Sequence, residues 1–268
     1  MYNYQLVYQV KPKKLSEMGF DSQSFVLIAG PCAVENEEDM KLYARFLLEH
    51  QIKYMRAGAF KPRTSPHTFQ GLGYEALEIL KRVKAETGIK IVTEITDYHD
   101  FPKYREFVDI LQIGARNMQN FPLLKAVGKT DHPVILKRGF GNTVEEWLGA
   151  AEHILMEGNP NVILCERGIR TFETSTRNTL DLSSVALLKQ LTKLPVIVDP
   201  SHATGRNDLI IPLSLASAAC GADGIIVEIH TYPERAKSDA IQALTLEDAS
   251  HLLQKIDTIL PAIQKIRK

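Results

Sequence analysis

The chain has 268 residues, of which 44% are hydrophobic and 24% are charged, a mixture that can bury the core of an ordinary globular domain. Its 32 lysines and arginines balance 32 aspartates and glutamates, which excludes a broad positive field for nucleic acid or anionic lipid. The three cysteines lie far apart and no apolar run reaches the ~20 residues of a membrane span, so we expect a cytoplasmic protein with no disulfide framework, no nucleic-acid partner and no membrane partner.

The first 22 residues stand outside any repeating pattern. They begin with the stretch MYNYQLVYQVKPKK, which has no apolar segment behind basic residues and therefore does not resemble a signal peptide. We expect residues 1–22 to form a short N-terminal extension, a small β-hairpin that covers the bottom of the domain that follows.

From residue 23 onward, short apolar runs alternate with longer segments of helical periodicity. Most runs are rich in β-branched residues and bounded by glycine or proline, as is typical of strands buried on both faces of a parallel sheet. They lie at residues 25–30, 53–58, 89–94, 109–114, 133–138, 161–167, 195–200 and 224–229. The alternation predicts an α/β fold in which residues 23–268 form one catalytic (β/α)8 TIM barrel.

The helical segments have recognisable ends. The segment at 72–88 ends at Gly88, a typical C-cap, and the segment at 143–158 begins with a capping box from Thr143 to Glu146. The other helical segments lie at residues 35–51, 97–107, 120–128, 182–193, 209–221 and 245–266. A doubly wound open sheet is the alternative fold, but no GxGxxG motif follows the first strand.

Positively charged residues gather where the predicted strands end, which is where barrel enzymes carry their active sites. These cations are Arg56, Lys61, Arg116, Lys137 and Arg167. Solvent-exposed strand ends would explain scattered polar residues. They would not explain five cations on one rim, which repel one another unless anions lie between them. Since arginine binds phosphate and carboxylate groups in bidentate fashion, the pattern predicts a ligand with several negative charges or two phosphorylated ligands.

A second group combines a thiol, an imidazole and a carboxylate. Cys32 follows the first strand, His202 follows the seventh and Glu228 ends the eighth, and these strands become neighbours when a barrel closes. Together with Asp239, they could hold a divalent transition metal. Two alternatives stay open at this point: Cys32 and His202 could form a nucleophile and its base, or Cys32 could be a small buried hydrophobic residue.

An ordered series of motifs covers most of the chain. The motifs are IAGPCAVE, RAGAFKPRTSP, TEITD, QIGARNMQN, LKRG, ERGIRTF, VDPSHATG, GIIVEIH and KSDA. Together they resemble those of the 3-deoxy-D-arabino-heptulosonate 7-phosphate (DAHP) synthases, in the compact type Iβ, barrel-only form. The resemblance implies a transferase that condenses phosphoenolpyruvate with erythrose 4-phosphate and releases phosphate. This is the first step of the shikimate pathway, which leads to chorismate and the aromatic amino acids.

The resemblance also implies roles for the residues at matching positions. One divalent metal ion, Mn2+, Fe2+, Co2+ or Zn2+, would be held by Cys32, His202, Glu228 and Asp239. Phosphoenolpyruvate would be bound by Arg56, Lys61, Arg116, Lys137 and Arg167. Erythrose 4-phosphate would be bound by Lys61, Pro62, Arg63, Thr64 and Asp239. The expected catalytic residues are Lys61, Glu94 and His202, and the proton transfer involving water is left open between Glu94 and Lys61.

Three other functions are weighed against this one. The sister 3-deoxy-D-manno-octulosonate 8-phosphate synthases use arabinose 5-phosphate, but they usually show a KANRSS-like stretch where this chain has KPRTS. A Schiff-base aldolase with Lys137 as nucleophile and a non-catalytic anion-binding barrel are the remaining alternatives. The family resemblance further implies a homodimer or homotetramer. No regulatory domain is expected beside the barrel, and a separate regulatory partner stays open.

Overall fold

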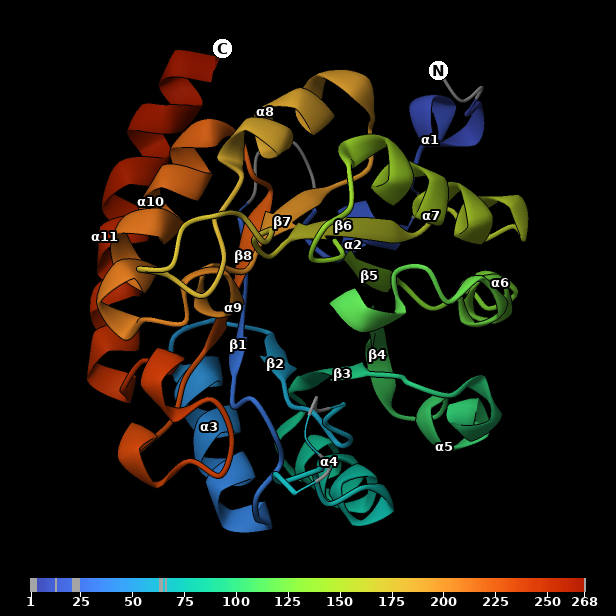
Figure 1. Ribbon diagram of the computed structural model, residues 1–268. Helices are drawn as coiled ribbons and strands as arrows, with labels where there is room; N and C mark the ends of the chain where they lie inside the picture. Colours follow the sequence, from blue (N-terminus) through green and yellow to red (C-terminus); the bar gives the residue numbers. More distant parts are fainter. Residues whose placement is uncertain (1–3, 13, 21–24, 63–64, 66, 268) are drawn as a thin grey trace.

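The computed structural model describes residues 4–12, 14–20, 25–62, 65 and 67–267. Eight parallel strands form a closed barrel in the order β1 to β8 (Figure 1). The strands are β1 (Val26–Gly30), β2 (Tyr54–Arg56), β3 (Lys90–Glu94), β4 (Val108–Ile113), β5 (Val134–Lys137), β6 (Val162–Glu166), β7 (Val196–Val198) and β8 (Gly224–Glu228). Because β1 pairs with both β2 and β8, the sheet has no free edge. The predicted TIM barrel is confirmed, and the open-sheet alternative is wrong.

Helices cover the outside of the barrel, as Figure 1 shows. The longer ones are α3 (Glu37–Glu49), α4 (Tyr74–Thr87), α6 (Phe121–Gly128), α7 (Val144–Met156), α8 (Leu182–Leu191), α10 (Ile210–Cys220) and α11 (Leu246–Arg267). Shorter turns are η1 (Tyr98–Asp100), α5 (Phe101–Tyr104), η2 (Ala115–Asn117), α9 (Pro200–Thr204), η3 (Asn207–Leu209), η4 (Pro233–Arg235) and η5 (Ala240–Gln242). The capping box is confirmed, since Thr143 Oγ1 accepts from the Glu146 N–H and Glu146 accepts from the Thr143 N–H. In the part of the chain that the structure describes, none of the helices combines the length and apolarity needed to cross a membrane.

The barrel interior is filled by apolar side chains, so any ligand must bind at an end of the barrel. Alternate residues of each strand point inward, and those inside form one buried cluster. Its strand residues are Val26, Ile28, Tyr54, Val92, Ile110, Ile135, Ile163, Cys165, Ile197 and Ile226. Polar residues appear where this packing stops, with Lys137 at the end of β5 and Glu228 at the end of β8.

The described residues of the N-terminal extension contain two short helical turns and no strand, so the predicted β-hairpin is wrong for that part of the chain. Its two turns are α1 (Leu6–Gln9) and α2 (Lys14–Glu17). The Glu152 carboxylate, from α7, accepts hydrogen bonds from the backbone N–H groups of Gln5, Leu6 and Val7 at 3.0, 2.9 and 2.7 Å. An anion at the first turn of a helix satisfies donors that would otherwise have no partner, which favours the helical turn over a strand pair.

The extension nevertheless covers the bottom of the barrel. Leu15 and Phe20 are buried in the same apolar cluster as the barrel interior, and the Tyr54 hydroxyl donates to the Met18 carbonyl at 3.2 Å. The predicted boundary between residues 22 and 23 lies outside the described residues.

Candidate metal centre and anion cavity

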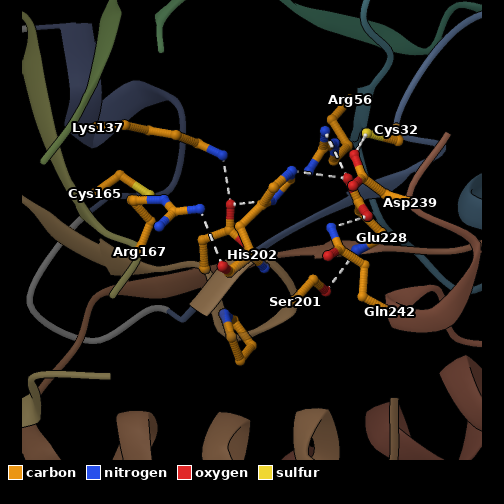
Figure 2. A network of polar contacts seen from close by, with 12 residues as sticks. Cys32, Arg56, Lys137, Cys165, Arg167, Ser201, His202, Glu228, Asp239 and Gln242 are labelled. Atoms are coloured by element: carbon orange, nitrogen blue, oxygen red, sulfur yellow. Dashed lines mark hydrogen bonds and ion pairs between the residues drawn. The ribbon is translucent and has the colours of Figure 1, made fainter. Parts of the chain in front are cut away.

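Four potential metal ligands meet at the C-terminal mouth of the barrel. The ligand atoms of Cys32, His202, Glu228 and Asp239 all lie within 4.8 Å of one another. Cys32 Sγ is 2.9 Å from Asp239 Oδ2, and His202 Nε2 is 3.0 Å from Glu228 Oε1. They come from the loop after β1, from α9, from the end of β8 and from the loop after β8, so the predicted convergence is confirmed (Figure 2). Asp239 has a φ of 57°, a left-handed conformation that is uncommon for residues other than glycine and that turns the loop at this point.

The chemistry of this group fits a divalent transition metal. Thiol, imidazole and carboxylate donors together suit such ions better than Mg2+ or Ca2+, which prefer oxygen ligands alone. Buried Glu228 Oε1 has no hydrogen-bond partner among the described residues, although His202 and the Arg56 guanidinium (3.2 Å) lie beside it. Burial alone would raise the pKa of the Glu228 carboxyl, but the charges of His202 and Arg56 outweigh burial and hold that pKa well below its usual range. An ionised, incompletely bonded carboxylate oxygen is therefore directed at the other ligands.

Cys32 has an environment that opposes a free thiolate. Burial, followed by the nearby charge of Glu228, raises the pKa of the Cys32 thiol to about 12. Nucleophilic cysteines need a lowered pKa, so the alternative in which Cys32 attacks a substrate with His202 as base is not favoured. A bound metal ion would instead stabilise the thiolate.

The raised pKa of Cys32 predicts that metal binding releases a proton. Since the thiol is protonated well below pH 12, a cation must displace its proton, and affinity should rise about tenfold per pH unit between about pH 7 and about pH 8.5. Calorimetric titration of the chelator-treated protein with Zn2+ measures the affinity at each pH. Repeating the titration in two buffers of different ionisation enthalpy measures the number of protons released. The Cys32→Ala variant should lose this pH dependence. An affinity that is independent of pH in the unaltered protein would contradict the prediction.

Asp199 fixes the orientation of His202. This aspartate, which follows β7, is the N-cap of α9 and accepts from the His202 backbone N–H at 3.0 Å. Its Oδ2 atom lies 2.7 Å from His202 Nδ1 and also contacts the Lys137 ammonium. Burial would raise the pKa of Asp199, but the charges of His202 and Lys137 keep it well below its usual range. One carboxylate oxygen thus holds a potential metal ligand and a rim cation together.

A cavity of about 300 Å³ opens beside the four potential ligands. It is lined by most of the residues predicted to bind or convert the substrates, namely Arg56, Lys61, Pro62, Glu94, Arg116, Lys137, Arg167, His202 and Asp239. Arg56, Lys137 and Arg167 are only 5, 4 and 3% exposed, so the alternative of solvated strand ends is wrong for these three. The two other predicted residues, Arg63 and Thr64, lie outside the described residues.

Two details of the cavity wall concern Arg56, which has donors available for an anionic ligand, and Glu94, whose carboxylate is fixed by its neighbours. Within the described residues, buried Arg56 Nε and Nη1 have no hydrogen-bond partner, and such donors are costly to leave without one. The Glu94 carboxylate accepts from Gln112 Nε2 at 3.2 Å and lies against Gly114. A Cβ atom at Gly114 would be 2.1 Å from Glu94 Oε1, so a larger residue there would displace that carboxylate from its present position.

Arg177 was not predicted as part of the site. Its Nη1 atom lies 3.3 Å from Asp239 Oδ1 and donates to Gln242 Oε1 at 3.1 Å, and the residue lines the cavity. Gln242 in turn donates to Glu228 Oε2 at 2.6 Å. The only sequence signal was the series of arginines in the long segment between β6 and α8.

Comparison with known proteins gives consistent results. A model described as the DAHP synthetase I family matches residues 8–262. The phospho-2-dehydro-3-deoxyheptonate aldolase of Thermotoga maritima is 51% identical over 249 residues, 93% of this chain and 74% of that protein. A crystal structure of phospho-2-dehydro-3-deoxyheptonate aldolase (DAHP synthase) from Thermotoga maritima matches with a TM-score of 0.94 and 48% identity, covering 98% of this chain and 79% of that one. A 2-dehydro-3-deoxyphosphooctonate aldolase of Syntrophotalea carbinolica is 32% identical over 251 residues, 87% of this chain and 90% of that protein.

Proposed function

This chain belongs to the DAHP synthetase I family, and from that membership we propose which of its residues carry the reaction. The reaction is the condensation of phosphoenolpyruvate with erythrose 4-phosphate to give DAHP and phosphate, the first step of the shikimate pathway. The octulosonate alternative is less favoured, because that relative is 32% identical and the heptonate relative is 51% identical.

One observation carries the assignment of the site: the potential metal ligands and the rim cations share one cavity. His202 and Asp239 belong to the ligand group and also line the cavity beside Lys61. We place phosphoenolpyruvate against the cations Arg56, Lys61, Arg116, Lys137 and Arg167. Two anionic substrates repel each other, and a fixed cation cluster offsets that repulsion while holding the reacting carbons close together.

Erythrose 4-phosphate is assigned to the part of the cavity next to Asp239. Lys61, Pro62 and Asp239 line it there. Arg63 and Thr64, which lie outside the described residues, follow Pro62 directly and remain the proposed partners of the aldose phosphate. Short loops that carry arginine and hydroxyl donors suit a phosphate group.

We assign one divalent ion, Mn2+, Fe2+, Co2+ or Zn2+, to Cys32, His202, Glu228 and Asp239. When bound, this ion supplies Lewis acidity at the aldehyde oxygen of erythrose 4-phosphate. Asp199 Oδ2 accepts a hydrogen bond from His202 Nδ1–H and thereby directs Nε2 toward Glu228.

The remaining step moves a proton from water. Carbon 3 of phosphoenolpyruvate bonds to the aldehyde carbon as the carbon–carbon double bond opens, and the aldehyde oxygen takes up a proton. Water adds to carbon 2 and gives up one proton. The carbon–oxygen bond to phosphate then breaks, and the hydroxyl at carbon 2 loses its proton to become the ketone oxygen. Lys61 Nζ already contacts Cys32 Sγ at 2.6 Å and Asp239 Oδ2 at 3.8 Å, whereas the Glu94 carboxylate faces the cavity and is oriented by Gln112. We therefore assign to Glu94 the role of the base that removes a proton from the attacking water. Lys61 is assigned the neutralisation of substrate charge. His202 acts as a ligand that Asp199 orients.

A phosphate-release assay tests the proposed function. With phosphoenolpyruvate, turnover should be rapid with erythrose 4-phosphate and at least ~100-fold slower with arabinose 5-phosphate. Chelator should abolish turnover, and added Mn2+ should restore it. The Schiff-base alternative predicts the opposite, namely irreversible trapping by borohydride with substrate and no effect of chelator. It is also disfavoured by the buried ion pair of Lys137 with Asp199, because a Schiff-base lysine must lose its proton.

The cytoplasmic location, the homodimer or homotetramer and the separate regulatory partner stay predictions from the sequence.

A further inference from the structure

One aromatic ring in the cavity wall lies against three guanidinium groups. The ring belongs to Phe140, which follows β5 and lines the cavity. The guanidinium carbons of Arg167, Arg170 and Arg116 lie 4.7, 5.0 and 5.3 Å from its centre. Arg116 is in η2, after β4, whereas Arg167 and Arg170 follow β6. The Arg170 backbone N–H also donates to the Phe140 carbonyl at 2.7 Å, which ties the two loops together.

A ring attracts cations without neutralising them. The face of an aromatic ring is electron-rich and attracts a cation within ~6 Å, but it accepts no full hydrogen bond and carries no charge. Arg138 also lies near a ring, with its guanidinium carbon 5.8 Å from the centre of Trp147, but here carboxylates hold the same guanidinium. Its Nη1 atom donates to Glu166, Asp181 and Ser184 at 3.0, 2.9 and 3.2 Å. Carboxylates therefore neutralise the charge of Arg138, and that residue does not line the cavity.

The charge of Arg167 remains available to a ligand. Its Nη1 and Nη2 atoms donate to the carbonyl oxygens of Gly168 and His202 at 3.3 and 3.0 Å, and both acceptors are neutral. Arg167 and Arg116 both line the cavity. A wall of carboxylates would have held these two arginines equally well but would also have repelled an anionic substrate.

We propose that Phe140 is a positioning residue whose ring holds the Arg116 and Arg167 guanidinium groups in the orientation that binds the phosphate and carboxylate of phosphoenolpyruvate. This inference rests on the function proposed above and assigns a role to an uncharged residue of the same site. Phe140 acts through the arginines and leaves the aldose and the metal ligands unaffected.

Three substitutions test the role of the ring. Phe140→Leu and Phe140→Met keep an apolar side chain of similar bulk but remove the aromatic face, and Phe140→Tyr keeps it. Calorimetric titration of the metal-loaded protein with phosphoenolpyruvate should show binding weakened roughly 5- to 30-fold in the Leu and Met variants, the loss expected for two cation–π contacts. The KM for phosphoenolpyruvate should rise by the same factor, while kcat, the KM for erythrose 4-phosphate and the metal content stay unchanged. The Phe140→Tyr variant should bind phosphoenolpyruvate as tightly as the unaltered protein.

Phe101→Leu is the matched control. Phe101 stacks on Tyr98 with ring centres 5.4 Å apart and does not line the cavity, so this variant should lower Tm without changing phosphoenolpyruvate affinity. Unchanged affinity in the Leu and Met variants would overturn the inference. So would an equal loss for both substrates, or a Tyr variant as weak as the Leu variant. If the unaltered protein releases no phosphate from the two substrates, the proposed function fails, and titration with inorganic phosphate alone decides the role of Phe140.

Discussion

The Cys32→Ala variant is expected to lose its bound metal and to turn over at least ~100-fold more slowly, while the barrel stays folded. Loss of a hydrogen bond that supports a metal ligand already costs up to ~100-fold in affinity or activity, and removal of the ligand itself should cost at least as much. The side chain is small and sits at the rim, where its Sγ contacts Lys61 and Asp239 and not the apolar barrel interior. The free energy of unfolding of the metal-free protein should therefore fall by only about 1 kcal/mol. Metal analysis of the dialysed protein, kcat and a metal-free thermal melt measure the three quantities.

Cys220→Ala provides the control for loss of a thiol. Cys220 lies in α10, far along the chain from the ligands, and its Sγ donates to the Leu182 carbonyl at 3.1 Å. This variant should keep full metal content and turnover. The assignment of the metal would be refuted by a Cys32→Ala protein that retains one tightly bound ion and normal kcat.

Asp199→Asn is expected to weaken metal binding and phosphoenolpyruvate binding together. The asparagine oxygen can still accept from His202 Nδ1, but the charge opposite the Lys137 ammonium is gone. Loss of a ligand's supporting carboxylate typically costs 10- to 100-fold in metal affinity, and loss of one partner of a buried ion pair costs about 3 to 5 kcal/mol. The kcat/KM for phosphoenolpyruvate should fall by roughly 100- to 1000-fold, with a lower Tm.

A matched aspartate at the opposite end of the barrel separates these effects from a general loss of stability. Asp223 precedes β8, accepts from Val196 N–H at 2.7 Å and pairs with Lys189 at 2.7 Å. Asp223→Asn should lower Tm but leave metal affinity and the KM for phosphoenolpyruvate unchanged. If both variants changed only Tm, Asp199 would have no role in coupling the two sites.

The barrel could be predicted because its strands are buried on both faces, which leaves an uninterrupted apolar run in the sequence. The helix after β5 was equally recognisable, since the side chains of Thr143 and Glu146 each accept a hydrogen bond from the backbone N–H of the other, three residues away. The N-terminal extension could not be predicted in the same way. Its helical turn depends on Glu152, 145 residues beyond Val7, and nothing in the local sequence indicates that contact.

In the candidate site too, residues beside apolar strands could be predicted, and residues placed by long-range contacts could not. Cys32 and Glu228 were predictable because they stand next to apolar strands that close against each other. Arg177 was missed because its position depends on how the long segment after β6 folds back, with its backbone N–H on the Thr204 carbonyl at 2.8 Å. The contact of Asp199 with Lys137 joins β7 and β5, two strands that are not neighbours, and only the curvature of the closed barrel brings them together.

The pairing of the first strand with the last has a consequence for synthesis on the ribosome. Cys32 is translated early, whereas Glu228 and Asp239 come after four fifths of the chain. An incomplete nascent chain therefore has the thiol but lacks the two acids, and it cannot assemble the four-ligand group. Binding of an ion by all four residues therefore requires that the last strand has been made and can close against the first.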